Sequence, residues 1–486
     1  MALVVGVDSS TTATKVEVRD TGDGRVVARG RVAHQATSPP RSEQDPASWW
    51  DAFEAACAMA GRPAVDAVAV AAQQHGLVVL DDGDRVVRPA KLWNDTESAP
   101  DADWLVGSLG AEAWAAACGS VPVASFTITK LSWLHRCEPE NFARLARVML
   151  PHDWLTFRLC GERVTDRGDA SGTGYWSPAE ERWRPDLLAM VDDSTDWERA
   201  LPAVLGPRAA AGAWGGAVVA PGTGDNMAAA LGLGLRPGDV AISLGTSGTA
   251  FTVAGAPCAD ATGAVAGFAD ASGRFLPLVC TLNATKVTDA VARLLGVEVA
   301  ALDALAAAAP AGSGGVVLVP YFDGERAPNR PGATGLLTGL RSDVEREQLA
   351  RAAFEGVVCG LLEGLDRLFD LAPPAAEGRT FLVGGGARSS AYRQAVADLS
   401  GRDVTVPGET EHVAAGACVQ AAAVLEGRDP AEVAEAWGLG SGAVVAPDPR
   451  VDRVAIRARY AAAAAAAGVG SSADPDPGSL TPRAAP

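Results

Sequence analysis

The chain has 486 residues, 48% of them hydrophobic, and 41 basic against 59 acidic residues give it a formal net charge of −18. This length predicts two large domains or three smaller ones, and the acidic balance disfavours a nucleic-acid partner because no basic stripe is available to neutralise phosphates. No apolar run reaches the roughly 18 residues of a membrane-spanning helix, and the first residues lack the pattern of a secretory signal. The eight cysteines show no CxxC spacing or disulfide framework, which is typical of a reducing compartment. We therefore expect a cytoplasmic protein without a membrane partner.

The N-terminal segment begins with an apolar run, residues 4–7, which is followed at once by Asp8, Ser9, Ser10 and Thr11. This pattern predicts a buried strand and a tight turn into a second strand. Such a turn directs backbone N–H groups and hydroxyls into one concavity that suits a phosphate. A carboxylate beside a phosphate suits a hydrated Mg²⁺ ion, so we interpret Asp8 as a candidate metal ligand. The alternative is a turn residue that bonds its own backbone.

Polar residues follow the next predicted elements, a helix at 49–60 and a buried strand at 64–70. Such residues could line a pocket for a polyhydroxy ligand, with a tryptophan as an apolar wall. A lone histidine is more often a satisfied structural residue, and both interpretations stay open at this point. The residues concerned are Gln74, His75, Trp93, Asn94 and Asp95.

Residues 110–160 are typical of helices, and a strand at 217–220 leads to the loop that carries Asp225. Gly222 and Gly224 let this loop approach a ligand closely. Asp225 has two interpretations. It is either a helix N-cap, a position that acids favour, or a general base that takes the proton from an attacking hydroxyl.

A second apolar run, residues 240–244, repeats the first pattern and is followed by Gly245, Thr246 and Ser247. It predicts a second strand–turn–strand unit with a second phosphate concavity. Gly245 stands where the first unit has Asp8. Two such units, one at the start of each half, predict two similar domains with a nucleotide between them.

The remainder of the chain alternates predicted helices with predicted strands, which indicates an α/β fold. A strand at 380–383 is followed by Gly384, Gly385 and Gly386, a run that suits either a closely bound ligand or a flexible turn, and Arg388 lies just beyond. Neither a P-loop nor a protein-kinase motif is present. The tail at 461–486 has an alanine-rich and then Gly/Ser/Asp/Pro-rich composition that predicts disorder. The other predicted elements are helices at 284–295, 346–369, 392–399 and 414–425 and a strand at 316–320.

Together these motifs resemble the FGGY family of carbohydrate kinases over nearly the whole chain, from about residue 3 to about residue 455. The match is specific because long segments agree at fixed spacing. There are three departures, one of which is Cys137 at the last place of a family signature around Lys130 and Trp133. Asp8-Ser9-Ser10-Thr11 stands where many relatives have Asp-Leu-Gly-Thr, and Gln74 stands where methionine is common in members that act on xylulose. The segments that carry the resemblance are residues 5–12, 42–50, 74–76, 92–95, 224–226, 243–248, 320–328, 335–340 and 348–355.

The resemblance implies two actin-like, ribonuclease-H-like domains, at residues 1–235 and 236–455, with ATP and a sugar in the cleft between them. It implies that Asp225 is the catalytic base and that Asp8 and Asp225 lie on the Mg²⁺ side of the site. The implied sugar contacts are Gln74, His75, Trp93, Asn94, Asp95, Asp225 and Asn226. The implied nucleotide contacts are Ser9, Ser10, Thr11, Gly245, Thr246, Ser247, Gly384, Gly385, Gly386 and Arg388.

The activity implied by the resemblance is ATP-dependent, Mg²⁺-assisted phosphorylation of D-xylulose to D-xylulose 5-phosphate. Two alternatives stay open. One is a kinase of the same family for ribulose, gluconate or a pentitol. The other is a non-catalytic nucleotide-binding switch on the same fold. The sequence also leaves a homodimer open.

Overall fold

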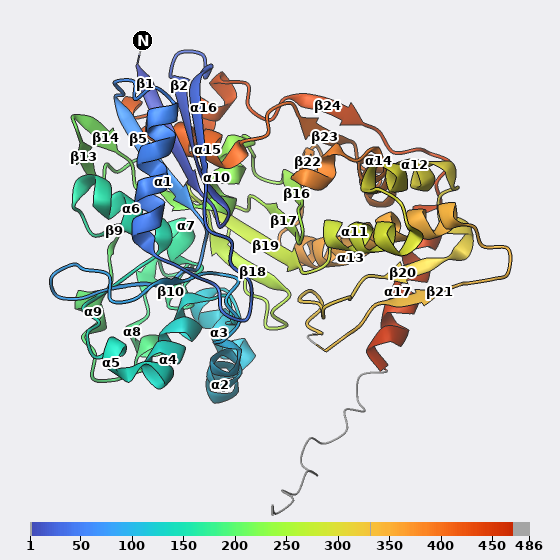
Figure 1. Ribbon diagram of the computed structural model, residues 1–486, viewed down its shortest axis with the longest axis horizontal. Helices are drawn as coiled ribbons and strands as arrows, with labels where there is room; N and C mark the ends of the chain where they lie inside the picture. Colours follow the sequence, from blue (N-terminus) through green and yellow to red (C-terminus); the bar gives the residue numbers. More distant parts are fainter. Residues whose placement is uncertain (1, 331, 470–486) are drawn as a thin grey trace, which may run out of the picture.

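The computed structural model describes residues 2–330 and 332–469 (Figure 1). Its two largest sheets have seven strands each and are flanked by helices, so the predicted α/β class is confirmed. We call the sheet that contains β1 the first sheet and the sheet that contains β16 the second sheet. Each sheet and the helices packed on it form a lobe, and the two lobes lie side by side along the longest axis of the molecule (Figure 1).

The first sheet is built around the antiparallel hairpin of β1 (Leu3–Ser9) and β2 (Ala13–Asp20), with β5 (Ala67–Ala72) parallel to β1. Residues 4–9 of β1 are all buried, because helices cover both faces of the sheet. This is why the strand is a continuous apolar run rather than an alternating one. On one face lies α1 (Pro46–Met59), which buries Trp49 and Phe53 against the hairpin side of the sheet.

The second sheet repeats this arrangement. The hairpin of β16 (Val240–Leu244) and β17 (Gly248–Thr252) is antiparallel, and β22 (Thr380–Val383) runs parallel to β16. The 26-residue helix α13 (Arg346–Leu371) packs on this sheet through a face of buried apolar residues. The repeated hairpin and parallel strand confirm the duplicated fold that the two similar sequence motifs predicted.

Two late helices of the chain pack on the first lobe. After β23 (Val404–Pro407), the helices α15 (His412–Glu426) and α16 (Pro430–Ala436) return to the first lobe, where α15 packs on β1, β5 and α10 (Asp225–Gly232) (Figure 1). The chain then rejoins the second sheet as β24 (Gly442–Val445). The first lobe therefore contains α15 and α16 in addition to the elements that precede residue 236.

One hairpin of the second sheet also reaches the first lobe. In the hairpin of β18 (Val265–Ala269) and β19 (Phe275–Thr281), the N–H of Gly267 donates to the Gly119 carbonyl at 2.9 Å, and the N–H of Ala269 donates to Ser171 Oγ at 2.9 Å. One buried apolar cluster therefore includes side chains of both lobes.

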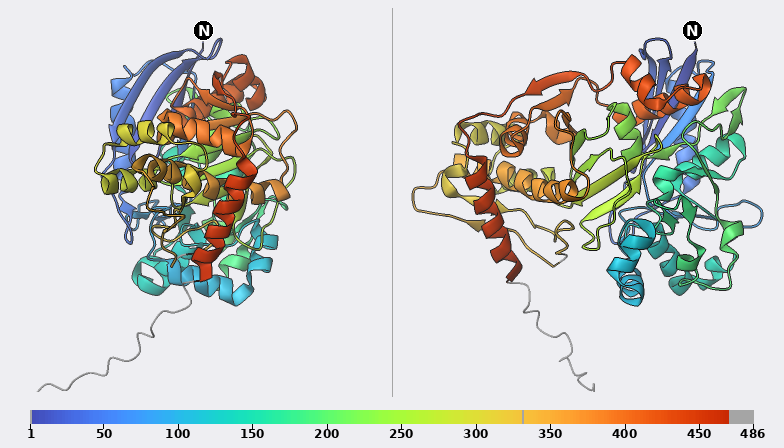
Figure 2. Two further views of the ribbon diagram at one scale, coloured as in Figure 1. Left: turned by 90° about the vertical axis from the view of Figure 1, so that its right-hand side faces the viewer. Right: turned by 180° about the vertical axis from the view of Figure 1, so that it is seen from behind.

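The predicted disordered tail is wrong for residues 461–469, which continue the helix α17 (Arg453–Val469). The run of alanines favours helix because alanine has the highest helix propensity, and Ala463 and Ala464 are buried against the second core with Tyr460. Figure 2 shows α17 at the end of the second lobe that is remote from the first sheet. The remaining part of that prediction, residues 470–486, lies outside the described residues.

The strand order of the first sheet is β13-β14-β5-β1-β2-β3 with β15 beside β5, and that of the second sheet is β18-β19-β17-β16-β22-β23-β24. No helix among residues 2–330 and 332–469 has the length and apolar character needed to cross a membrane. The remaining elements of the first lobe are β3 (Val26–Ala33), β4 (Glu43–Gln44), β6 (Val78–Leu80), β7 (Ala90–Lys91), α2 (Ala99–Leu109), α3 (Ala111–Cys118), α4 (Thr127–Cys137), α5 (Pro139–Phe142), β8 (Arg147–Met149), α6 (Pro151–Cys160), β9 (Val164–Asp166), α7 (Arg167–Ala170), β10 (Trp176–Ser177), β11 (Arg182–Trp183), α8 (Pro185–Leu188), α9 (Trp197–Ala200), β12 (Ala203–Leu205), β13 (Gly212–Trp214), β14 (Ala217–Val219) and β15 (Thr223–Gly224). Those of the second lobe are α11 (Thr285–Leu295), α12 (Val299–Ala308), β20 (Val317–Val319), β21 (Leu336–Thr338), α14 (Ser390–Ser400) and short 3₁₀ helices at Ser313–Gly315 and Gly385–Arg388.

Candidate active site

Three neighbouring strands bring the predicted site residues of the first lobe to one edge of the sheet. Asp8 near the end of β1 pairs with Ala71 of β5, and Thr223 of β15 pairs with the same Ala71. Because the three strands are parallel, their carboxyl ends lie at the same edge. Gln74 follows β5 by two residues and Asp225 directly follows β15. The topology thus places Asp8, Gln74 and Asp225 together.

Asp225 is the first residue of α10, and the N-cap is Gly224, so the alternative interpretation as N-cap is wrong. Its half-buried carboxylate accepts hydrogen bonds from the backbone N–H of Asn226 at 2.8 Å and from Asn226 Nδ2 at 3.0 Å. Loss of water, and then the negative charges of Asp8 and Asp169, raise the pKa of Asp225 to about 7. A carboxylate with a pKa near neutrality is suited to accept a proton.

Asp8 is buried and held on both sides. The Ser10 hydroxyl donates to one carboxylate oxygen, and Lys15 Nζ lies 3.1 Å from the other. Burial raises the pKa of Asp8 above its usual value, and the Lys15 charge opposes this increase. Two carboxylates that meet at one sheet edge, beside a hydroxyl, form the oxygen-rich donor set that Mg²⁺ prefers. The residues present therefore fit the ion that the resemblance implies.

The hydroxyls of the first turn are committed to protein partners. Ser9 is buried, and its Oγ lies 3.2 Å from Thr14 Oγ1, inside the hairpin. Thr11 Oγ1 donates to Gln73 Oε1 at 3.1 Å and accepts the indole N–H of Trp93 at 2.8 Å. Of the predicted phosphate contacts in this turn, the Ser9 hydroxyl is thus engaged inside the hairpin, and the Thr11 hydroxyl holds Trp93 against the turn.

The predicted sugar pocket contains polar atoms without protein partners. Asn226 Nδ2 donates to Gln74 Oε1 at 2.7 Å, which joins the loop of Asp225 to the end of β5. Gln74 Nε2 and Asn94 Oδ1 are buried and have no hydrogen-bond partner among the described residues. An unsatisfied buried polar atom is costly, so a hydroxylated ligand that bonds these atoms would relieve that cost.

His75 is held by protein contacts, and burial and nearby charges lower its pKa. Its Nδ1 lies 2.7 Å from the Gly172 carbonyl oxygen, and its ring stacks on Phe126 with centroids 5.0 Å apart. Burial, then the charges of Lys130 and Arg326, lower the pKa of His75 to about 3. The ring is therefore neutral. Since a carbonyl can only accept, Nδ1 carries the proton and Nε2 is left as an acceptor.

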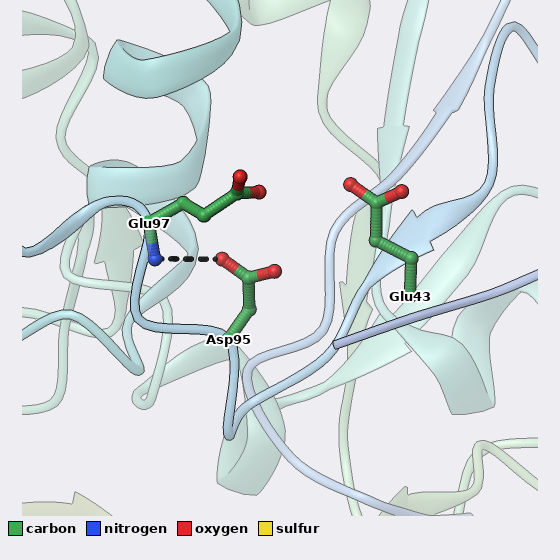
Figure 3. A group of neighbouring side chains, drawn as sticks. All are labelled: Glu43, Asp95 and Glu97. Atoms are coloured by element: carbon green, nitrogen blue, oxygen red, sulfur yellow. Dashed lines mark hydrogen bonds between the residues drawn. The ribbon is translucent and has the colours of Figure 1, made fainter. Parts of the chain in front are cut away.

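The carboxylate of Asp95 is bound by protein groups. Figure 3 shows Glu43 facing Asp95 and Glu97, three carboxylates close enough for a metal site. The ammonium of Lys91, which is not drawn there, lies 3.2, 3.0 and 2.6 Å from these carboxylates and takes the place of an ion. Asp95 is fully buried and also accepts the backbone N–H of Ser42. These contacts hold the loop of Asp95 in place.

The second hairpin and the glycine run lie against each other. Gly384 has a φ of +86°, and an added Cβ would lie 2.6 Å from the Leu244 carbonyl oxygen at the end of β16. Only glycine accommodates both conditions. Thr246 is exposed at the turn after β16, and Arg388 is exposed one turn beyond the glycines. The predicted nucleotide contacts of the second lobe are thus brought together.

A buried charged cluster beneath the Asp225 loop was missed by sequence reasoning. His152 Nδ1 lies 2.8 Å from Asp169 Oδ2, and His152 Nε2 lies 3.1 Å from Asp153. Asp166 accepts the Thr223 hydroxyl at 2.7 Å, two residues before Asp225. The pair His152-Asp153 at the start of a helix was the available signal, but its burial depends on long-range packing.

Comparison with known proteins decides the family. The model of the FGGY carbohydrate kinase N-terminal domain matches residues 3–232, and that of the C-terminal domain matches residues 240–425. The chain belongs to the FGGY family of carbohydrate kinases. It is 49% identical to the xylulose kinase of Streptomyces coelicolor, covering 91% of this chain and 92% of the relative, and 48% identical to that of Streptomyces rubiginosus, covering 93% and 95%.

Solved structures agree with this family assignment. The crystal structure of xylulose kinase from Bifidobacterium adolescentis has a TM-score of 0.86 and 42% identity, covering 95% of this chain and 99% of that one. A gluconate kinase from Lactobacillus acidophilus has a TM-score of 0.88 at 22% identity, covering 96% and 98%, which shows the fold alone.

Proposed function

We propose that this FGGY kinase transfers the γ-phosphoryl group of ATP to the terminal hydroxyl of D-xylulose, giving ADP and D-xylulose 5-phosphate. The single observation that carries the proposal is Asp225, whose half-buried carboxylate has a pKa of about 7 at the sheet edge shared with Asp8. The choice of sugar is supported by two relatives named xylulose kinase at 48–49% identity over more than nine tenths of the chain.

In the proposed mechanism, the oxygen of the sugar hydroxyl attacks the γ-phosphorus while Asp225 accepts the proton of that hydroxyl. Asn226 donates to the same carboxylate through its backbone and side chain, which fixes its orientation. A general base of this kind contributes about 10²–10⁴ in rate. The proton taken from the hydroxyl is later released to solvent, so that charge and atoms balance.

The nucleotide would lie between the two hairpins. We propose that backbone N–H groups of Gly245, Thr246 and Ser247 bind its phosphates and that Gly384 to Gly386 lie near the adenosine. Asp8 and Asp225 would hold Mg²⁺, which when bound neutralises charge on the phosphates. Most catalysis of phosphoryl transfer comes from such positioning and charge stabilisation.

The sugar would be recognised by the unsatisfied atoms Gln74 Nε2 and Asn94 Oδ1 together with His75 Nε2. These supply one donor and two acceptors to a polyhydroxy chain, and Trp93 supplies an apolar wall. Ligand binding in a cleft between lobes also excludes water, which is a competing acceptor for the phosphoryl group.

The test is ADP release from the purified protein with Mg·ATP, measured without sugar and with D-xylulose, D-ribulose or D-gluconate at equal concentrations. Stimulation by D-xylulose above the others supports the proposal. Stimulation by another compound keeps the chemistry and overturns the substrate. ATP binding with no stimulation by any sugar favours the non-catalytic nucleotide switch instead.

The base is tested with Asp225→Asn, which keeps the shape and removes the proton acceptor. We expect turnover to fall about 10²–10⁴-fold while ATP binding is retained. The matched control is Asp429→Asn, a change at an exposed helix N-cap in the same lobe. Wild-type turnover in a folded Asp225→Asn variant would refute the assignment.

A further inference from the structure

Helix α15 follows a strand of the second sheet in sequence but packs on the first sheet, whose carboxyl edge carries Asp8 and Asp225. It follows β23 of the second sheet through residues 408–411 and packs on β1, β5 and α10 (Figure 1). Its contacts reach both carboxylates of the proposed site through intermediate groups.

The middle of α15 holds the loop of Asp225. Gln420 is 1% exposed, its Oε1 accepts the backbone N–H of Gly222 at 3.0 Å, and its Nε2 donates to the carbonyl oxygen of Gly222 at 2.9 Å. One side chain thus satisfies both backbone polar groups of a residue that lies three positions before Asp225. Gly222 has a φ of +79° and no room for a side chain against the Val70 carbonyl and the His152 ring, so only glycine fits this position.

The start of α15 reaches the other carboxylate. Glu411, directly before the helix, lies 2.7 Å from Lys15 Nζ, and the same ammonium lies 3.1 Å from Asp8. Two residues earlier, Glu409 pairs with Arg19, which has no contact with Asp8 among the described ion pairs. The two acids therefore resemble each other in place and chemistry but differ in their connection to the site.

We propose that α15 is a positioning element for the phosphoryl-transfer site: Gln420 fixes the loop of Asp225, and Glu411 fixes Asp8 through Lys15. The inference rests on the proposed function of the two carboxylates. Neither Gln420 nor Glu411 touches a reacting atom, so both act as positioning residues.

Gln420→Met tests the first contact, because methionine has a similar length but neither donates nor accepts a comparable hydrogen bond. The matched control is Gln394→Met on α14, where the amide bonds Asp398 in the second lobe. A displacement of a catalytic group by about 1 Å costs up to about 10²-fold in rate. We therefore expect kcat to fall at least about tenfold in Gln420→Met, with the KM for ATP within about twofold of wild type and no change in Gln394→Met.

Amide hydrogen exchange gives a readout independent of activity. In Gln420→Met we expect faster exchange at residues 222–226 and unchanged exchange in β5 and β16. A merely destabilised protein would exchange faster throughout. Wild-type kcat, or wild-type protection at residues 222–226, in the folded variant would overturn the inference. A wild-type protein without sugar-dependent ADP release would instead count against the proposed function, and the exchange measurement would still decide the role of Gln420.

Glu411→Ala and Glu409→Ala test the second contact and are expected to fold because both side chains are partly exposed. Removing one partly exposed ion pair changes an equilibrium constant by about two- to fivefold. We expect a loss of kcat of this size in Glu411→Ala only. If Gln420→Met fails to fold, Glu411→Ala and Glu409→Ala test the inference on their own. Equal effects of these two substitutions on kcat would overturn it.

Discussion

At the residue scale, the carboxylate of Asp225 is held where a negative charge is costly. Loss of water and the nearby Asp8 and Asp169 raise its pKa to about 7, whereas the unfolded value is near 3.8. The proposed base works only when ionised. We therefore predict that kcat/KM for the sugar falls about tenfold per pH unit below about pH 7.

The measurement is sugar-dependent ADP release from pH 5.5 to 8.5 at saturating Mg·ATP and again at low sugar concentration. A profile that stays flat down to pH 5.5 would contradict the assignment of this carboxylate as base.

His152 illustrates a second charge that the fold buries. The carboxylates of Asp153, Asp169 and Asp166 outweigh the cost of burial and raise the pKa of His152 to about 9. The folded pKa lies above the unfolded value of 6.5, so the stabilisation is full below pH 6.5 and is lost as the pH rises through about 9. His152→Gln should lower the free energy of unfolding by about 3 kcal/mol at pH 6 and by less at pH 10.

Chemical denaturation of wild type and variant at pH 6, 7 and 10 checks this prediction. The control is His135→Gln, which replaces an exposed histidine of α4 and should change stability by less than about 0.5 kcal/mol. The same difference between wild type and His152→Gln at pH 6 and pH 10 would contradict a charged imidazole in the cluster.

Local geometry sets the positions of Asp8 and Asp225. Asp8 lies near the end of β1 and Asp225 directly follows β15, and the small residues beside each indicate close approach to a ligand. The surroundings of Asp95 depend instead on Lys91, four residues earlier, and on Glu43, which the pairing of β4 with β7 brings beside Lys91. The burial of His152 likewise depends on Asp166 and Asp169, which no local pattern connects to it.

At the element scale, the crossing of α10 and α15 depends on two glycines. An added Cβ at Gly416 would collide with the Ala228 carbonyl of α10, and one at Gly232 would collide with the His412 carbonyl of α15. Overpacking of this kind costs about 1–3 kcal/mol or more. We predict that Gly416→Ala destabilises the protein by at least that amount, and that it lowers kcat because α15 moves away from Gly222.

Thermal unfolding and sugar-dependent ADP release check this prediction. The matched control is Gly107→Ala inside α2, where no atom lies within 4 Å of the added Cβ. That change should stabilise the protein by about 0.5–1 kcal/mol because alanine has the better helix propensity. A Gly416→Ala variant as stable as Gly107→Ala would show that the helices can separate without cost.

The helix α15 also shows that the sequence can predict an element without predicting the sheet on which it packs. Residues 414–425 are predicted as helix from their composition, and the structure has a helix at His412–Glu426. The sheet on which it packs cannot be read from its own residues, because most positions are small and apolar on every side. The contact with α10, more than 180 residues earlier, selects the first lobe.

At the scale of the whole molecule, the two lobes share a core. One buried cluster includes Leu231 of α10, Phe268 of β18 and Leu276 of β19, and the helices α15 and α16 belong to the first lobe although they follow the second sheet in sequence. Proteins with several domains often unfold in separate steps. A core that extends over both lobes favours a single step instead.

The tryptophans make this testable, because all twelve report on the first lobe. Eleven lie between residues 49 and 214, and Trp437, just after α16, donates its indole N–H to the Thr21 carbonyl. Tryptophan fluorescence therefore follows the first lobe alone, while circular dichroism follows both lobes. We predict that the two denaturation curves coincide.

A substitution remote from every tryptophan gives the stronger test. Tyr460 of α17 is 2% exposed in the second core, and Tyr460→Ala should cost about 3 kcal/mol or more. If the lobes unfold together, the tryptophan fluorescence transition must shift to lower denaturant by the same amount as the circular dichroism transition. The control is Val454→Ala on the same helix, where the side chain is 72% exposed and neither curve should move. A fluorescence transition that stays in place while the circular dichroism transition splits would show that the lobes are independent, and that the cluster bridging them is too weak to couple the second sheet to the catalytic edge of the first.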